Sequence, residues 1–398
     1  TTATGKVTVL KHGDRFGEST LLANQGDKTD LHIVAMEDTC CVFITNKSFE
    51  AVLGSINRLA KSKGGLATYL DSKVTMDVLK KHTILGAGTF GQVWLVSNKD
   101  SGKSSNVLYA LKIQNKRELI KHGQVRGVIR EKKIMESIDH PFVIKLVNAF
   151  QDENSIFMVM NLVQGGELYG VLDPDGIPEP NAKFYASCIL EGLSYMHNRS
   201  MVYRDLKPEN VLIDKDGYCI IIDLGFAKVI TDKTYTLCGT PLYIAPEIIL
   251  HKGYDKSVDI WSFGVILYEM LYGCNPYYED DMDQMMLFKR IARNHYSFPS
   301  DSEVSDAGQD LISKILVTKP TDRFGSLIGG ANDIREHIWL HNISFEELVS
   351  KSIKAPWLPD IQDPFDVSKF ECWDHLEDKQ YLNEKPLSKQ EQKLFYSF

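Results

Sequence analysis

YRDLKPEN, residues 203–210, is the stretch that decides how this chain folds, and Asp223 follows it thirteen residues later. It places a carboxylate (Asp205), an amine (Lys207) and an amide (Asn210) on one short loop, and Asp223 adds a second carboxylate. Phosphoryl transfer requires such a set, because one group must accept a hydroxyl proton and oxygen ligands must hold Mg²⁺ on the phosphates. An ordinary polar loop could also read DxKxxN, but the whole octapeptide with this aspartate spacing favours phosphoryl transfer.

The bulk composition is typical of a soluble globular protein, with 43% hydrophobic and 25% charged residues. A chain of 398 residues suits two or three domains. The net charge of −8 gives no reason to expect nucleic acid or an anionic membrane as a partner, whereas it suits basic peptides.

The seven cysteines form no CxxC pair and no zinc-like cluster, so we expect reduced thiols and a cytoplasmic protein. No apolar segment resembles a signal peptide or approaches the roughly 20 residues that cross a bilayer. The longest apolar run, residues 264–271, is interrupted by Glu269 and predicts a buried helix. Secreted and membrane-spanning classes are therefore not expected.

Hydrophobic periodicity predicts a β-rich region followed by a helical one. Short β-like runs in residues 1–45 precede an apolar helical face over 48–72, and a second β-rich region begins near Val78. In that second region we predict strands over 93–97, 107–113, 143–150 and 155–163, and a charged helix over 117–137. Further helices are predicted over 181–198, 257–272 and 306–316. The YRDLKPEN loop then lies at the junction of a small β lobe and a larger helical lobe, where a ligand cleft is expected.

A glycine-rich turn of the form GxGxxGxV lies between two of these strands and predicts a phosphate-binding loop. Its residues are Leu85, Gly86, Ala87, Gly88, Thr89, Phe90, Gly91, Gln92 and Val93. A dinucleotide-binding turn would be followed by a helix rather than a strand. Lys112 ends the next apolar strand as a candidate phosphate contact, and Glu131 is its expected partner.

Together these motifs resemble the catalytic domain of eukaryotic protein kinases, over residues 78–339. The resemblance implies an α+β, bilobal fold and an enzyme that uses ATP and Mg²⁺. It implies that Asp205 accepts or orients the substrate hydroxyl proton, that Lys207 neutralises charge on the phosphoryl group, and that Asn210 and Asp223 bind the metal. Met160 and Val163 would lie at the adenine pocket.

The same resemblance implies structural pairs around this loop. Glu247, in the APE motif, would pair with Arg323, and Asp259 would brace the catalytic loop. Leu224 replaces the commoner phenylalanine of DFG and keeps its apolar contact. Because the catalytic set is complete, an active enzyme is favoured over the alternative of a non-catalytic, nucleotide-sensing scaffold.

Two features of the sequence resemble the AGC group of kinases. One is Tyr203, which precedes Arg204 and Asp205, and the other is TLCGTP at 236–241. In that group Thr236 is the phosphorylated position, and its phosphate would pair with Arg204. Thr240 would hydrogen-bond near Asp205. Residues 340–398 resemble the group's C-terminal tail and end in FYSF, which implies that Phe395 and Phe398 dock on the small lobe and support the Glu131 helix.

Three further acidic positions bear on substrate choice. Glu167, Glu209 and Glu269 match residues that recognise basic side chains upstream of the target Ser or Thr in the cyclic-nucleotide-dependent kinases. Leu242 stands where that family often has an acidic residue. The resemblance therefore implies Arg/Lys-rich substrates, with recognition of more distant basic residues left open.

Residues 1–60 resemble the C-terminal part of a cyclic-nucleotide-binding β-roll, joined to the kinase by a predicted helical linker over 61–77. GDRFGE at 13–18 matches its phosphate-binding cassette, and the predicted nucleotide-binding residues are Gly17, Glu18, Lys28 and Thr29. A lysine at 28 cannot reproduce the bidentate grip of the usual arginine, while Thr29 matches cGMP-selective sites. Binding of cGMP, of cAMP or of neither therefore stays open, including a purely structural front domain.

A cyclic-nucleotide domain directly before an AGC kinase is the layout of the cGMP-dependent protein kinases. The resemblance thus implies cGMP as a regulator of a serine/threonine kinase.

Overall fold

The structure, a computed structural model, describes residues 70–99, 107–230, 232–300, 302–373, 375–376 and 387–398. All of these belong to one compact unit, Tyr69–Phe398. The predicted β-roll, with Gly17, Glu18, Lys28 and Thr29, lies outside the described residues.

The end of the predicted helical linker is not helical where the structure describes it. Residues 70–78 form turns and irregular backbone before the first strand. Val74 is buried in the small lobe, and its carbonyl accepts a hydrogen bond from the Asn148 amide at 2.8 Å. Tertiary contacts of this kind override the local helical periodicity that the prediction relied on.

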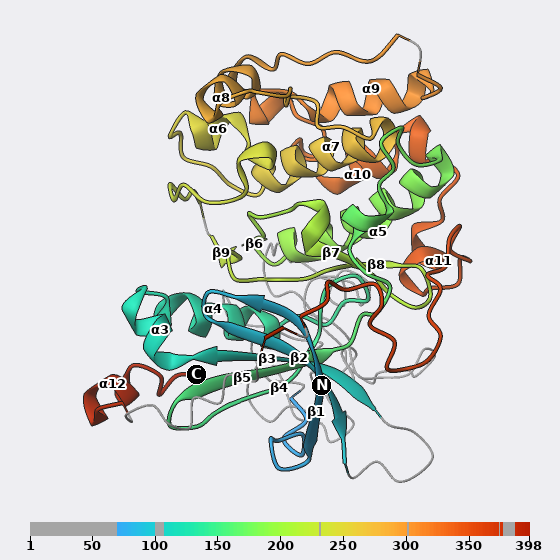
Figure 1. Cartoon of the computed structure of the whole chain (residues 1–398). Helices are drawn as coiled ribbons and strands as arrows, with labels where there is room; N and C mark the ends of the chain where they lie inside the picture. The colour runs from blue at the N-terminus through green and yellow to red at the C-terminus, as the bar shows by residue number, and fades with distance from the viewer. Residues whose placement is uncertain (1–69, 100–106, 231, 301, 374, 377–386) are drawn as a thin grey trace, which may run out of the picture. The chain divides into compact units, whose positions relative to one another are not determined.

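A five-stranded antiparallel sheet forms the small lobe, in the order β1-β2-β3-β5-β4 (Figure 1). Its strands are β1 (Leu79–Gly88), β2 (Gly91–Asn98), β3 (Leu108–Asn115), β4 (Leu146–Gln151) and β5 (Ser155–Asn161). Alternate residues of the three central strands point to one face, because side chains in a strand alternate with a period of two. The resulting core includes Trp94, Val96, Leu111, Ile113, Phe157 and Val159.

Two helices, and not the single predicted one, follow β3. They are α3 (Lys116–Lys121) and α4 (Val125–Glu136). Asn115 caps α3 by accepting a hydrogen bond from the Glu118 backbone N–H, and Gly123 breaks the run with a φ of 66°. Glycine takes this left-handed conformation without the penalty that other residues incur, so α4 starts in a new direction.

The predicted strand over 143–150 begins three residues late. Ile144 donates its backbone N–H to Ile221, and Ile221 donates to Phe142, at 2.8 and 2.9 Å. Residues 142–144 therefore pair with the large lobe, and only β4 continues along β5. This exchange ties the two lobes together through the backbone.

The large lobe is mainly helical (Figure 1). Every residue of its central helix α7 (Ser257–Tyr272) is buried, which confirms the predicted buried helix. Its other helices are α5 (Glu179–His197), α6 (Pro246–Ile249), α8 (Gln284–Arg293), α9 (Asp306–Ile315), α10 (Ala331–Arg335) and α11 (Phe345–Val349). Short strands β6 (Met201–Val202), β7 (Val211–Ile213), β8 (Cys219–Ile221) and β9 (Lys228–Val229) carry the loops that face the small lobe. Single 3-10 turns occupy Leu168–Val171, Pro208–Asn210, Pro241–Tyr243, Pro320–Asp322 and Ile338–Leu340.

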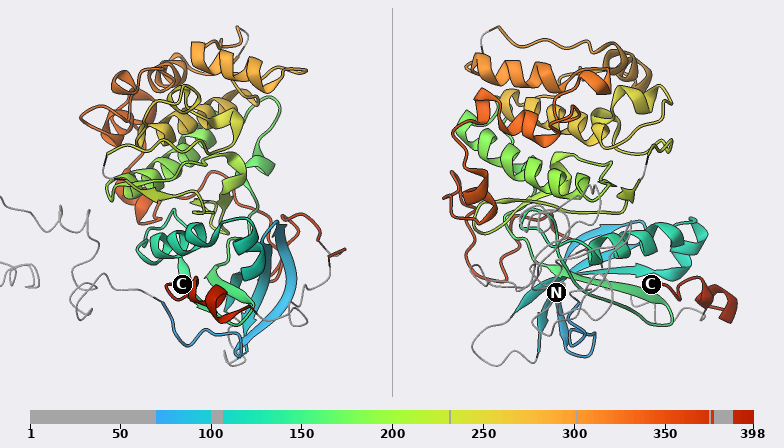
Figure 2. Two further views of the ribbon diagram at one scale, coloured as in Figure 1. Left: turned by 90° about the vertical axis from the view of Figure 1, so that its left-hand side faces the viewer. Right: turned by 180° about the vertical axis from the view of Figure 1, so that it is seen from behind.

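The tail after residue 340 is mostly irregular in its described part, as predicted, and returns to the small lobe. Figure 2 shows its last helix, α12 (Lys389–Lys393), beside the sheet and close to α3. Phe395 is fully buried there, and its carbonyl accepts a hydrogen bond from the Gln151 side chain at 2.9 Å. In the part of the chain that is described, no helix is long and apolar enough to cross a membrane.

Candidate active site

The YRDLKPEN loop is held in place by Asp259, a buried residue in the first turn of α7. Its carboxylate accepts the backbone N–H groups of Tyr203 at 2.9 Å and Arg204 at 2.7 Å, and it hydrogen-bonds His197 at 2.7 Å. The first two bonds hold Arg204 at a φ of 75°, a conformation that is costly for a residue with a side chain. Asp259 thus braces this loop, as predicted.

Asp205 is held by three neighbours on its own loop and the next. Its carboxylate accepts hydrogen bonds from the Asn210 amide at 3.0 Å and from the Thr240 hydroxyl at 2.9 Å, and the Lys207 ammonium lies 3.8 Å away. Burial raises the pKa of Asp205 above its ordinary value, against the opposing effects of Lys207 and the two donors. A fixed carboxylate with a raised pKa is a suitable proton acceptor for an incoming hydroxyl.

Lys112 joins the small lobe to the large one. Its ammonium lies 2.7 Å from the Glu131 carboxylate on α4 and 3.8 Å from Asp223, at the start of the DLG motif. Burial alone would lower the pKa of Lys112, but the two carboxylates more than offset this and raise it. Lys112 is therefore a permanent cation, placed between two elements that come from different lobes.

The glycine-rich hairpin between β1 and β2 covers a cavity of about 460 Å³. Gly91 is required there, because a Cβ at that position would lie 1.7 Å from the Ile113 carbonyl oxygen. The cavity is lined by Gly86, Ala87, Gly88, Thr89, Phe90, Gly91, Gln92, Val93, Lys112, Glu131 and Asp223, among others. The predicted nucleotide contacts Leu85, Met160 and Val163 do not line this cavity. Leu85 and Val163 are buried, and Met160 pairs with Ala110 in the sheet.

Asn210 and Asp223, the predicted metal ligands, carry oxygens of the kind that Mg²⁺ prefers. Asn210 is buried, whereas the Asp223 side chain is 48% exposed at the cleft. Among the described residues, no group of three or more His, Cys, Asp or Glu side chains could hold a metal by itself. A Mg²⁺ ion at this place would therefore complete its coordination with phosphate oxygens and water, as is usual for nucleotide-bound magnesium.

Thr236 is exposed on the segment that leads to the APE motif. Its carbonyl accepts a hydrogen bond from the Tyr254 hydroxyl at 2.6 Å, and Arg204 donates to the same hydroxyl at 3.3 Å. Lys228 on β9 donates to Thr234 at 2.9 Å. Tyr254 lies 18 residues from Thr236, and no local pattern in the sequence singles out its role.

The segment that carries Thr236 ends on a buried ion pair. Glu247 and Arg323 form two hydrogen bonds, at 2.8 and 3.0 Å, and Arg323 is fully buried. Arg323 also donates to the Ser257 carbonyl at 2.7 Å. The predicted pair is therefore present, and it anchors the segment to the first residue of α7.

The three predicted substrate carboxylates influence one another electrostatically. Burial and then the charges of Glu209 and Glu371 raise the pKa of Glu167. Burial raises the pKa of Glu269 to about 7, and Glu209 contributes to this. The Glu269 carboxylate accepts hydrogen bonds from Tyr243 at 2.8 Å and Asn275 at 2.9 Å, two partners that sequence reasoning missed.

The C-terminal FYSF docks against α3, α4 and β4. The Lys116 ammonium lies 5.1 Å from the centre of the Phe395 ring, and the Lys132 ammonium lies 5.4 Å from that of Phe398. Lys116 is itself almost fully buried and donates to the Gln392 side chain at 2.9 Å. The chain end therefore contacts the helix that carries Glu131, as predicted.

Comparison with known proteins agrees with this geometry. Residues 79–340 match the family model described as protein kinase domain. The chain is 42% identical to cAMP-dependent protein kinase type 3 of Saccharomyces cerevisiae over 289 residues, which cover 72% of this chain and 71% of that protein. It is 40% identical to the cAMP-dependent protein kinase catalytic subunit of Dictyostelium discoideum over 309 residues, which cover 77% of this chain and 46% of that protein.

A third relative matches over more of the chain. The identity to cGMP-dependent protein kinase 2 of Rattus norvegicus is 34% over 405 aligned positions, which cover 92% of this chain and 52% of that protein. The chain thus spans about half the length of two of these three relatives.

Proposed function

The chain belongs to the protein kinase domain family, and from this premise we propose that it is a serine/threonine kinase for basic protein or peptide substrates. The family implies the use of ATP and Mg²⁺. The observation that carries the proposal is the Asp205 carboxylate, which Asn210, Thr240 and Lys207 hold. Asp223, which lines the cavity beside Lys112, lies close enough to Asp205 to contribute to its raised pKa.

In this proposal each side chain has a defined task in phosphoryl transfer. Asp205 orients the substrate hydroxyl and accepts its proton as the oxygen attacks the γ-phosphorus of ATP, while the bond from that phosphorus to the β–γ bridging oxygen breaks and ADP leaves. The Lys207 ammonium, 3.8 Å from Asp205, balances negative charge on the transferred group. Lys112, held by Glu131, positions the phosphates, and the backbone of residues 86–91 covers them. Asn210 and Asp223 would hold Mg²⁺, which supplies charge neutralisation on the phosphate oxygens.

The preference for basic substrates is supported by clustered negative charge. The charge of Glu209 raises the pKa values of both Glu167 and Glu269, in addition to the effect of burial. An arginine side chain placed among these carboxylates would relieve their mutual repulsion and form ion pairs with their ionised forms.

Phosphorylation of Thr236 is proposed as the activating modification. A phosphate on this exposed residue would add about two negative charges next to Arg204 and Lys228. Arg204 precedes Asp205, so a new ion pair there would order the catalytic loop and the Thr236 segment together.

Regulation by cGMP is proposed for the front of the chain, with Gly17, Glu18, Lys28 and Thr29 as ligand contacts. It is supported by the extent of the rat cGMP-dependent relative's alignment. Residues 70–398 make up only about 83% of the chain, so an alignment over 92% includes part of residues 1–69. Calorimetry with cGMP and with cAMP on the longest natural form tests this, and the absence of heat with both would remove the nucleotide from the proposal.

The kinase proposal is tested with peptides that differ only in the acceptor residue. Ser, Thr and Tyr versions of one peptide with arginines upstream of the acceptor are incubated with ATP, Mg²⁺ and the protein. We expect phosphate on the Ser and Thr versions and a loss of efficiency of at least about tenfold when the arginines become glutamine. Phosphate on the Tyr version alone, or transfer that does not depend on arginine, would refute this substrate class.

A further inference from the structure

The tip of the glycine-rich hairpin is attached to both ends of α3. Gly88 of β1 pairs with Gly91 of β2, and the two residues between them form the turn. At the start of α3, the Asn115 backbone N–H donates to the Phe90 carbonyl at 2.9 Å. Just after the end of α3, the His122 ring packs edge-to-face with the Phe90 ring, with ring centres 5.6 Å apart and planes at 74°. The tip is therefore held through both its backbone and its side chain.

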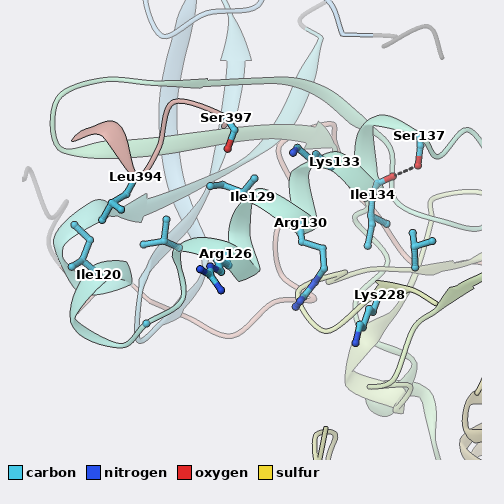
Figure 3. A pocket seen from close by; sticks show the side chains of 13 residues that line it. Ile120, Arg126, Ile129, Arg130, Lys133, Ile134, Ser137, Lys228, Leu394 and Ser397 are labelled. Carbon is cyan, nitrogen blue, oxygen red and sulfur yellow. Dashed lines mark hydrogen bonds between the residues drawn. The ribbon is translucent and has the colours of Figure 1, made fainter. Parts of the chain in front are cut away.

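His122 opens the three-residue link 122–124, which joins α3 to α4. Figure 3 shows Ile120 near the end of α3 and Arg126 near the start of α4, on the two sides of this link. The Nδ1 of His122 lies 3.0 Å from the Glu118 carbonyl oxygen and 3.6 Å from the Glu118 carboxylate. Because a carbonyl oxygen only accepts, Nδ1 carries the hydrogen and donates it. The last turn of α3 thus fixes the orientation of the ring that meets Phe90.

The same region bounds the cavity under the hairpin. Leu119 of α3, Gln124 of the link and Gly127 of α4 line this cavity together with Phe90 and Lys112. The contact between the two rings therefore lies at the edge of the proposed nucleotide site. Movement of the hairpin tip away from His122 would open this cavity to solvent.

We propose that His122 is a positioning residue for phosphoryl transfer, which holds the glycine-rich hairpin over the nucleotide phosphates through its contact with Phe90. This role rests on the proposed function, because it places ATP in the cavity. Backbone N–H groups of residues 86–91 can donate to phosphate oxygens only while the hairpin stays over them. An edge-to-face ring pair changes the equilibrium between held and released hairpin by about twofold to tenfold.

The role predicts an effect on nucleotide affinity and not on the chemical step. A ligand that needs the held hairpin binds with an apparent Kd equal to its intrinsic Kd divided by the fraction of hairpin that is held. Loss of the His122 ring lowers this fraction, so the apparent Kd rises. Asp205 and Lys207 keep their places on the large lobe, so kcat does not fall. A released hairpin also lets ADP leave more easily, which acts in the same direction on kcat.

The experiment compares wild type with His122→Ala and His122→Phe. Calorimetry with a non-hydrolysable ATP analogue and Mg²⁺ gives Kd, and initial rates give KM for ATP and kcat. We expect His122→Ala to raise Kd and KM by about threefold to tenfold without a fall in kcat. His122→Phe keeps an aromatic ring and should restore both values to within about twofold. The His122 side chain is 39% exposed, so neither change disturbs the core.

A double-mutant cycle assigns the effect to the ring pair. Phe90→Ala should raise Kd as well, and Phe90→Ala/His122→Ala should raise it no further than Phe90→Ala alone. Two residues that act independently would instead multiply their effects.

A matched control is available on the large lobe. His295 is an exposed histidine that follows α8, and His295→Ala should bind the analogue as the wild type does.

Three outcomes would overturn the role of His122. They are an unchanged Kd in His122→Ala while wild type binds the analogue, multiplied effects in the double variant, and a lower Kd in His122→Ala. The last outcome would show that the contact keeps the hairpin away from the phosphates. A wild-type protein that binds no analogue would overturn the proposed function together with this role.

Discussion

At the scale of single residues, Glu269 is a carboxyl group whose ionisation depends strongly on its surroundings. It lies in the last turn of the buried helix α7 and is only 7% exposed. Its hydrogen bonds from Tyr243 and Asn275 favour the carboxylate, but burial and Glu209 outweigh them and place its pKa at about 7. A pKa in this range leaves a substantial protonated fraction at neutral pH, where an ordinary glutamate is almost fully ionised.

This pKa predicts a pH-dependent affinity for basic peptides. Since the deprotonated carboxylate is the form that pairs with arginine, KM for an arginine-containing peptide should rise by up to about tenfold as the pH falls from 8 to 6. Glu269→Gln should have a high KM that does not change over this range. Steady-state kinetics at saturating ATP check this, and a wild-type KM that stays constant with pH would exclude Glu269 as the arginine partner.

Gly91 offers a second test at this scale. An alanine Cβ would lie 1.7 Å from the Ile113 carbonyl, where β2 pairs with β3, so the strands would have to separate. We expect Gly91→Ala to lower the free energy of unfolding by about 3 kcal/mol, the upper part of the range for overpacking, and to weaken ATP binding. Gly86→Ala is the matched control, because nothing lies within 4 Å of its added Cβ. Equal stability of the two variants in urea unfolding would contradict this close approach of the hairpin to β3.

At the scale of elements, α4 is the helix on which several parts of the molecule act. One face holds Glu131 against Lys112, and another receives the C-terminal aromatic residues. Gly123 separates it from α3, so α4 runs in a direction of its own. A helix with these connections is suited to transmit the state of the tail to the active site.

Removal of the buried tail aromatic should therefore affect catalysis. Phe395→Ala deletes a fully buried ring, a change that costs about 3–5 kcal/mol in a core. Because the tail can detach by itself, we expect protease sensitivity near residue 395 and a several-fold lower kcat in place of global unfolding. Tyr396→Ala, at a residue that is 75% exposed, should behave as the wild type. Limited proteolysis and initial-rate measurements distinguish the two variants. Identical behaviour of Phe395→Ala and Tyr396→Ala would show that the tail does not affect catalysis through α4.

At the scale of the whole molecule, a nucleotide bound in the cleft would contact residues of both lobes. Lys112 and the hairpin belong to the sheet, while Asp205, Asn210 and Asp223 belong to the large lobe. A ligand that contacts both sets stabilises the folded unit by mass action, by about 2.7 kcal/mol at a hundred times its Kd.

Thermal unfolding should report this contact with both lobes. ATP with Mg²⁺ should raise Tm by about 2–4 °C, and Mg²⁺ alone should not. In Asp223→Asn the shift should shrink toward that given by ATP without Mg²⁺. A full shift in this variant would show that Asp223 does not take part in metal-dependent binding.

The sequence predicted the parts of this fold that rest on local periodicity, such as the buried α7. The Lys112–Glu131 pair and the brace at Asp259 join segments far apart in the chain, and they lie where the resemblance to protein kinases implied. The break at Gly123 was missed although its cause, a glycine at positive φ, is local. The pairing of residues 142–144 with β8 was missed, since it depends on a contact between segments far apart in the chain. Tyr254 and Tyr243 were missed for the same reason, as their partners lie 18 and 26 residues away.

The most direct test of the central claim is the initial rate of phosphate transfer from ATP to an arginine-rich serine peptide, for wild type, Asp205→Asn and Asp173→Asn. Asp173 is exposed and lies outside the described cleft, so it controls for the loss of one carboxylate. Loss of the proton acceptor should lower kcat of Asp205→Asn by about 10²–10⁴-fold while Asp173→Asn keeps its rate. Equal rates for wild type and Asp205→Asn would contradict the assignment of phosphoryl transfer to this site.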